Sequence, residues 1–197
     1  MSPPHFHHPA AERGAQHPGL DPRLDAELAA VVTGARRRAQ RDGDRQVDTA
    51  HLLHTLLESD PEVRAVFDHP QLARLLGYLV QRAIGYGLRW QGTVEDSGAV
   101  PVLNEVDGWS PAAATALDAA YGRATRLGRP CARGVDLLAT IVADPTSRAV
   151  EVLDRAGVDA RTVAARVEEA AVQGYAPRWA GAGDAGRRAG TRFDGPR

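Results

Sequence analysis

The sequence predicts an all-α protein of eight helices, arranged as two similar four-helix units with pseudo-twofold symmetry. The stretch AQRDGDRQVDTAHLLHTLL, from Ala39, aligns with ATRLGRPCARGVDLLATIV, from Ala124, and each matched residue recurs 85 positions later, as Gly43 does at Gly128. Apolar residues recur at steps of three and four residues in both halves, as on one face of a helix. Aromatic residues make up only 5% of this alanine-rich chain, a balance that favours close-packed helices over sheets.

The first unit covers residues 23–84. Its first helix has one apolar face and ends at Gly43, because glycine readily adopts the left-handed conformation that terminates helices. The next three helices begin at residues that suit a helix N-terminus, namely Asp48 or Thr49, Pro61 and Pro70. The helix from Pro61 is predicted to run through Phe67.

The second unit, residues 109–175, repeats this order. Ser110 caps its first helix, which ends at Gly128. The other three helices are predicted at 136–143, from Pro145 to Gly157, and from an Asp159 cap to about Gln173. One unit alone would bury little surface, so the two are expected to share a core as one domain over 23–175.

Three further segments connect or flank the units. Residues 1–22 and 176–197 are rich in glycine, proline and polar residues and are predicted to be disordered arms. The connection 85–108 is longer than is usual between packed helices. Its apolar residues fit either a short hairpin or a segment lying across the groove between the units: Val100, Val102, Leu103 and Val106.

Composition excludes several classes of function. The net charge is −1, which provides no overall basic field for nucleic acid. All 24 basic residues are arginine, so a lysine Schiff base and a phosphate-loop lysine are both excluded. The single cysteine, Cys131, cannot form an internal disulfide. With no secretory signal and no apolar run of about 20 residues, a cytoplasmic protein is expected.

The paired motif resembles the Clp N-terminal repeat, in which a helix, a glycine and about five residues precede T-E-H-[IL]-L-L-x-L. It reads GDRQVDTAHLLHTLL at 43–57 and GRPCARGVDLLATIV at 128–142, and LDRAGVD at 153–159 matches the family's L-x-x-A-G-V-D. The resemblance covers about residues 22–174. It implies an eight-helix domain that docks substrates, adaptors or small ligands and performs no chemistry. It also implies a free-standing domain, because the ATPase modules that normally follow are missing.

The motif departs from the family at the positions that carry ligand recognition. In ClpC-like members, the glutamate of each T-E-H recognises phosphorylated arginine, and Ala50 and Val135 occupy those positions here. Neither side chain can accept a hydrogen bond from a guanidinium, so weak or absent phosphoarginine binding is expected. Thr49 and His51 are retained in the first copy, whereas Gly134 and Asp136 replace them in the second.

These observations predict a non-catalytic protein- or peptide-binding module that acts as an adaptor, decoy or regulator in Clp-dependent protein quality control. Its expected partners are Clp ATPase or protease components, their substrates or peptide-like ligands. The predicted binding groove lies at the starts of the second and sixth helices, around Thr49, Ala50, His51, Gly134, Val135 and Asp136. No catalytic residue, cofactor or metal site is predicted, since no nucleophile–base pair is evident.

Two other groups of residues offer alternative binding sites. The arginine cluster consists of Arg36, Arg37, Arg38, Arg41 and Arg45. It is either a solvated face or a binding surface for nucleic acid or a signalling partner, and the balanced charge and missing aromatic platform argue against nucleic acid. His51 and His54 could supply half a metal site, but no third ligand is evident from their spacing.

Overall fold

The computed structural model describes residues 21–83, 95 and 108–173, and this part of the chain contains eight α-helices and no strand. The helices are α1 (Ala26–Asp42), α2 (Thr49–Ser59), α3 (Pro61–Ala65), α4 (His69–Ala83), α5 (Pro111–Arg126), α6 (Gly134–Ala143), α7 (Arg148–Arg155) and α8 (Ala160–Gln173). The predicted all-α fold of two four-helix units is confirmed.

Local sequence explains where most helices begin and end. The Asp25 carboxylate accepts a backbone N–H in the first turn of α1 at 2.8 Å, and Gly43 ends that helix with a φ of 72°. The Ser110 hydroxyl caps α5 at 3.1 Å, and Pro111 follows at the first helical position, where its missing N–H costs no hydrogen bond. The predicted Ser110 cap and the predicted stop at Gly43 are therefore confirmed, and the Asp25 cap is an addition from the structure.

Several helix boundaries differ from those expected, including the end of α7 at Arg155 instead of Gly157. Helices α4, α6 and α7 begin at His69, Gly134 and Arg148 instead of Pro70, Asp136 and Pro145, and α3 ends at Ala65 instead of Phe67. The shift in α7 has a clear cause, because the Ser147 hydroxyl accepts the N–H of Val150 at 3.2 Å and caps the helix there. Proline was therefore a weaker start signal in this segment than the serine two residues further on.

The two units are joined by crossed backbone contacts that repeat the 85-residue offset. Leu24, just before α1, forms a parallel bridge with Ala132, just before α6. Val47, just before α2, forms the equivalent bridge with Trp109, just before α5. Leu24 and Trp109 are 85 positions apart, and so are Val47 and Ala132, so the pseudo-twofold symmetry relates the two bridges. Each unit therefore anchors the second helix of the other.

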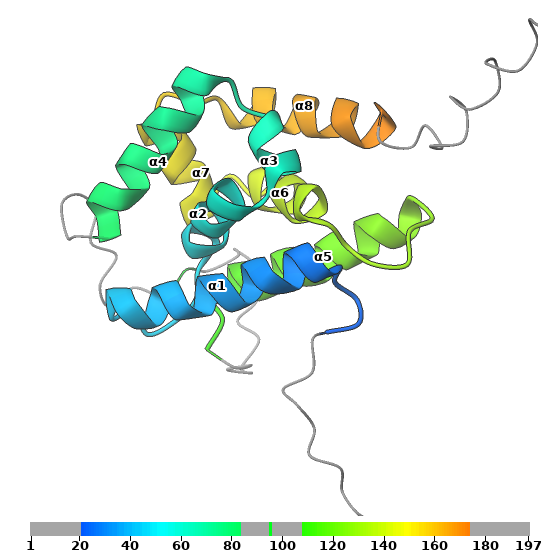
Figure 1. Ribbon diagram of the computed structural model, residues 1–197, viewed down its shortest axis with the longest axis horizontal. Helices are drawn as coiled ribbons and strands as arrows, with labels where there is room; N and C mark the ends of the chain where they lie inside the picture. Colours follow the sequence, from blue (N-terminus) through cyan, green and yellow to red (C-terminus); the bar gives the residue numbers. More distant parts are fainter. Residues whose placement is uncertain (1–20, 84–94, 96–107, 174–197) are drawn as a thin grey trace, which may run out of the picture.

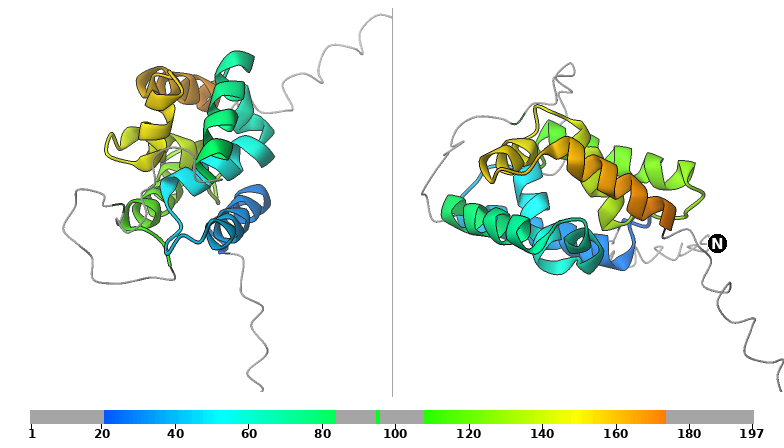
Figure 2. Two further views of the ribbon diagram at one scale, coloured as in Figure 1. Left: turned by 90° about the vertical axis from the view of Figure 1, so that its left-hand side faces the viewer. Right: turned by 90° about the horizontal axis from the view of Figure 1, so that it is seen from above.

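Helices α2 and α6 form the centre of the core. Every residue of α2 from Thr49 to Leu57 is buried, as is the start of α6 from Gly134 to Leu138. Figure 1 shows both helices between α1 and α5 on one side and α4 and α8 on the other. Figure 2 shows the two units lying side by side. The first turns of α2 and α6 therefore lie inside the protein, so the residues of the predicted site are buried.

The predicted arms lie outside the described residues except for 21 and 22, and so does the connection except for residues 95 and 108. The hairpin considered for Val100, Val102, Leu103 and Val106 is among the parts not described, and the domain boundaries remain predictions. Within the described ranges, no helix has both the length and the apolar character that crossing a bilayer requires.

Candidate functional site

The six predicted site residues form the first turns of α2 and α6, and all six are buried: Thr49, Ala50 and His51 in α2, and Gly134, Val135 and Asp136 in α6. The side chains of His51 and Asp136 are 0% exposed. The side chains of Thr49, His51 and Asp136 form hydrogen bonds that hold the helix starts in place.

The two triplets lie at opposite ends of an antiparallel helix pair. Gly134 lies beside Leu56 and Asp60, at the C-terminal end of α2. Thr49 lines a small cavity of about 60 Å³ together with Ile141 and Asp144, at the C-terminal end of α6. Because α2 has 11 residues, its ends are about 16 Å apart. The six residues therefore form two separate sites and not one continuous groove.

The N-cap carboxylate of α2, Asp48, is buried in a network of charged groups. It accepts the N–H of His51 at 2.9 Å and pairs with Arg82 of α4 at 2.9 Å and Arg148 of α7 at 2.8 Å. Burial alone would raise the pKa of Asp48, but the hydrogen bond from His51 and the two guanidinium groups outweigh it and hold the pKa below its ordinary range. Asp48 therefore stays charged and ties α2 to α4 and α7.

The start of α6 carries its charge at a different position. The N-cap residue Arg133 makes no side-chain cap, and Asp136, three residues later, accepts the Arg133 N–H at 3.0 Å. The Asp136 carboxylate also pairs with Arg123 and Arg129. Asp136 corresponds to His51 in the 85-residue offset, so the acid has moved from the cap position in α2 to the third helical position in α6.

Glu95 joins the start of α2 to the second unit, and sequence analysis did not identify it. Its carboxylate accepts the backbone N–H groups of Thr49 at 2.9 Å and Arg148 at 2.7 Å, which begin α2 and α7. It also accepts the hydroxyls of Thr49 and of Ser110, the cap of α5. Glu95 is only 4% exposed. A single acid therefore satisfies backbone donors at the starts of α2 and α7, where the helix dipole stabilises negative charge, and binds the hydroxyl that caps α5.

Ala50 and Val135 hold the positions where the resemblance implied glutamates. They are 0% and 2% exposed and belong to the hydrophobic core. Position 134 has room only for glycine, because a Cβ added there would lie 1.8 Å from the carboxylate of Asp60, which caps α3. The two predicted sites are therefore apolar or tightly packed where a phosphoarginine site needs acids.

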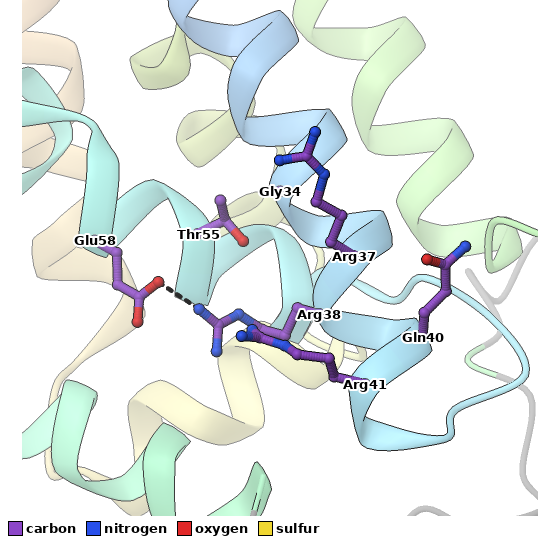
Figure 3. Close-up of a pocket in the computed structure, with 7 residues that line it drawn as sticks. All are labelled: Gly34, Arg37, Arg38, Gln40, Arg41, Thr55 and Glu58. Carbon is purple, nitrogen blue, oxygen red and sulfur yellow. Dashed lines mark hydrogen bonds and ion pairs between the residues drawn. The ribbon is translucent and has the colours of Figure 1, made fainter.

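An open groove of about 750 Å³ lies between α1 and α2, and its walls carry part of the arginine cluster. Figure 3 shows its lining residues: Gly34, Arg37, Arg38, Gln40, Arg41, Thr55 and Glu58. Arg38 pairs with Glu58, whereas Arg37 and Arg41 are exposed and form no ion pair with any described residue.

Nearby, burial and the charge of Arg38 lower the pKa of His54 to about 4, so His54 is neutral at pH 7.

The other arginines of the cluster do not line this groove. The Arg36 guanidinium lies 5.0 Å from the centre of the Trp109 ring, in a cation–π contact that links α1 to the start of α5. Arg45 is exposed in the loop after α1. The cluster is therefore not one surface, and only three of its members share the groove.

Comparison with known proteins identifies the fold. No protein-family model matches the sequence, and no curated protein matches it. Among solved structures, the N-terminal domain of the caseinolytic protease associated chaperone ClpD from Arabidopsis thaliana is similar, with a TM-score of 0.53, 16% identity, and coverage of 75% of this chain and 93% of that chain. A structure from investigations of a malarial protein secretion system has a TM-score of 0.56 and 16% identity, and covers 79% of this chain and 99% of that chain.

These similarities show that the chain has the fold of a Clp N-terminal domain. The identity is low, so the evidence for the fold comes from the arrangement of the helices. The resemblance seen in the paired motif is confirmed at the level of fold.

Proposed function

We propose that this protein is a non-catalytic protein- or peptide-binding module that acts as an adaptor, decoy or regulator in Clp-dependent protein quality control. The supporting observation is its fold, which it shares with the N-terminal domain of ClpD, a protease-associated chaperone. The proposed partners are Clp ATPase or protease components, their substrates or peptide-like ligands. Affinity capture from the native cell tests this proposal: retention of a Clp ATPase or ClpP supports it, and retention of neither contradicts it.

The use of the polar groups at the helix starts supports a role in binding without catalysis. Asp48, Asp136 and Glu95 each cap a helix or hold buried donors. His54 is neutral at pH 7 and packed in α2. These side chains support the fold, and none of them is paired with an exposed hydroxyl or thiol nucleophile in the described part of the chain.

Recognition is proposed at the surfaces over the starts of α2 and α6. Because Ala50 and Val135 carry no acid, the ligand is expected to be more apolar than phosphoarginine, such as an apolar peptide or peptide-like compound. Phosphoarginine should bind at least about a hundredfold more weakly than to a glutamate-bearing Clp N-domain, since two charge-assisted hydrogen bonds are missing. Isothermal titration calorimetry of both proteins in one buffer measures the difference, and equal affinity would show that the sites have not changed.

The arginines of the groove support a second candidate function, binding of nucleic acid or an acidic signalling partner. Exchanging both Arg37 and Arg41 for glutamate should weaken the binding of a fluorescent DNA duplex or a polyglutamate peptide at least about tenfold, and the wild-type affinity should fall steeply with salt. Arg126→Glu with Arg161→Glu is the matched control, because it makes the same charge change outside the groove. Equal losses in both double variants, or no binding by the wild type, would exclude this function.

A further inference from the structure

Three potential metal ligands converge where α1 ends and α2 begins. Asp42 is the last residue of α1, Asp44 follows the helix-terminating Gly43, and His51 lies in the first turn of α2. One oxygen from each carboxylate and one nitrogen of His51 all lie within 4.8 Å of one another. The His51 Nε2 atom is 3.1 Å from Asp44 Oδ2 and 3.9 Å from Asp42 Oδ2.

The turn between the helices explains why the two carboxylates converge. Gly43 has a left-handed φ of 72°, and the N–H of Asp44 bonds back to the carbonyl of Ala39 at 3.0 Å. This geometry folds the chain back over the last turn of α1 and brings Asp44 beside Asp42. In the sequence His51 has His54 as its near neighbour, but its two carboxylate partners, Asp42 and Asp44, come from the end of α1.

The burial and the contacts of the His51 imidazole suit metal coordination. Its side chain is 0% exposed, and Nε2 is a buried atom that forms no hydrogen bond, since the Asp44 oxygen lies off the N–H direction. Its Nδ1 atom lies 2.6 Å from Asp48 Oδ1 and 3.2 Å from the Asp48 backbone nitrogen. The Asp48 backbone N–H points at Nδ1, but Asp48 Oδ1 lies closer to the same atom, at a distance where two lone pairs would repel. We infer that the shorter contact holds the ring proton on Nδ1, which leaves Nε2 as the nitrogen available to a metal, within 3.9 Å of one oxygen of each carboxylate.

The outer contacts resemble those that orient metal-binding histidines in proteins. A ligating histidine usually donates its other ring N–H to a carboxylate, which fixes the ring and raises its basicity. Asp48 has this position here, and Arg82 and Arg148 hold it in turn. The carboxylates of Asp42, Asp44 and Asp48 surround the His51 ring, and the guanidinium groups of Arg82 and Arg148 offset part of their negative charge. Arg82 is also 3.8 Å from Asp44, which moderates the affinity for a cation.

We propose that His51, Asp42 and Asp44 form a binding site for a divalent transition metal of the zinc class, with water completing the coordination. One imidazole nitrogen and two carboxylate oxygens suit zinc, and bonds of about 2.0–2.2 Å place tetrahedral ligand atoms about 3.3–3.6 Å apart. The observed separations of 3.1 and 3.9 Å lie on either side of that range. The site lies at the joint of α1, α2 and α4, so a bound ion would brace the first unit.

The test uses the full chain with His5, His7, His8 and His17 replaced by alanine, because these N-terminal histidines could bind metal independently. After chelator treatment, calorimetry with zinc sulfate should show one equivalent bound, and cobalt(II) should produce the visible absorption of a tetrahedral N/O site. Asp44→Asn and Asp44→Ala should each weaken zinc binding at least about tenfold while the helical circular dichroism is unchanged. His54→Gln is the matched control, since it removes the other buried histidine of α2 and should leave zinc binding unchanged.

The alternative arrangement is a protonated His51 shared by Asp44 and Asp48 without a metal. It predicts no zinc uptake by the histidine-depleted chain at neutral pH. If both Asp44 variants bind zinc as the parent does, the bound zinc lies elsewhere in the chain. Either result overturns the metal site. These zinc results are independent of whether the protein binds Clp components, because the affinity capture that tests Clp binding is performed in the presence of a chelator.

Discussion

Replacing Asp48 by alanine is expected to lower the free energy of unfolding by about 3–5 kcal/mol. Asp48 is 0% exposed and pairs with both Arg82 and Arg148. Its removal would take away the buried carboxylate that both guanidinium groups share, and the loss of one partner from a buried ion pair is strongly destabilising. The variant would also lose the N-cap of α2. Chemical denaturation at pH 7, followed by circular dichroism in chelator, measures the loss.

Asp25→Ala is the matched control for this prediction. Asp25 also caps a helix, accepting an N–H at 2.8 Å, but it forms no ion pair with a described residue, so its removal should cost only about 1 kcal/mol. Asp48→Asn tests the charge alone, because an amide can still accept the capping hydrogen bond. If Asp48→Ala costs no more than Asp25→Ala, the buried ion network contributes nothing beyond a cap.

The pH dependence provides a second measurement on the same group. The pKa of Asp48 is lower in the folded protein than in the unfolded chain, so its stabilisation is present above the unfolded value near 4. It is lost as the pH falls below that value toward the lowered folded pKa. Asp48→Asn should lack this part of the acid-induced loss.

Replacing Glu95 by alanine is expected to cost about 3 kcal/mol, because the side chain accepts hydrogen bonds from two backbone N–H groups and two hydroxyls in a buried position. Water that enters the space left behind can satisfy some of these donors, which keeps the loss below the sum of the separate bonds. Hydrogen exchange should also accelerate at the amides of Thr49 and Arg148, which donate to the carboxylate.

Glu95→Gln separates charge from hydrogen bonding. The amide keeps one acceptor oxygen but loses the negative charge that the N-termini of α2 and α7 favour, so an intermediate loss of about 1–2 kcal/mol is expected. Exchange rates at amides in the middle of α8, which donate no hydrogen bond to Glu95, should change only through global unfolding. Unchanged exchange at Thr49 and Arg148 in Glu95→Ala would show that the carboxylate does not hold the two helix starts together.

The candidate site was only partly predictable from the sequence. The repeat offset located the first turns of α2 and α6, and reading Ala50 and Val135 against the family motif showed which acids are missing. Three things were not predictable: the burial of both turns, their separation along an antiparallel helix pair, and the approach of Asp60 to Gly134. Each depends on the packing of one unit against the other, which no local pattern encodes.

The proposed metal ligands were also only partly predictable from the sequence. His51 was visible as a candidate, but Asp42 and Asp44 looked like ordinary polar residues at a helix end. They become candidates only because Gly43 turns the chain and α1 packs on α2. A search for acids flanking the glycine that ends the preceding helix would have found them.

By itself, the sequence determined the helices, most of their caps and the two-unit plan, because periodicity, capping and turn residues act over a few neighbouring positions. Tertiary structure alone decided the crossed bridges from Leu24 to Ala132 and from Val47 to Trp109, the role of Glu95, and the meeting of His51 with two carboxylates. These features bring together residues that are separated along the chain and meet only after packing. Their geometry is therefore a property of the folded core and not of any short segment.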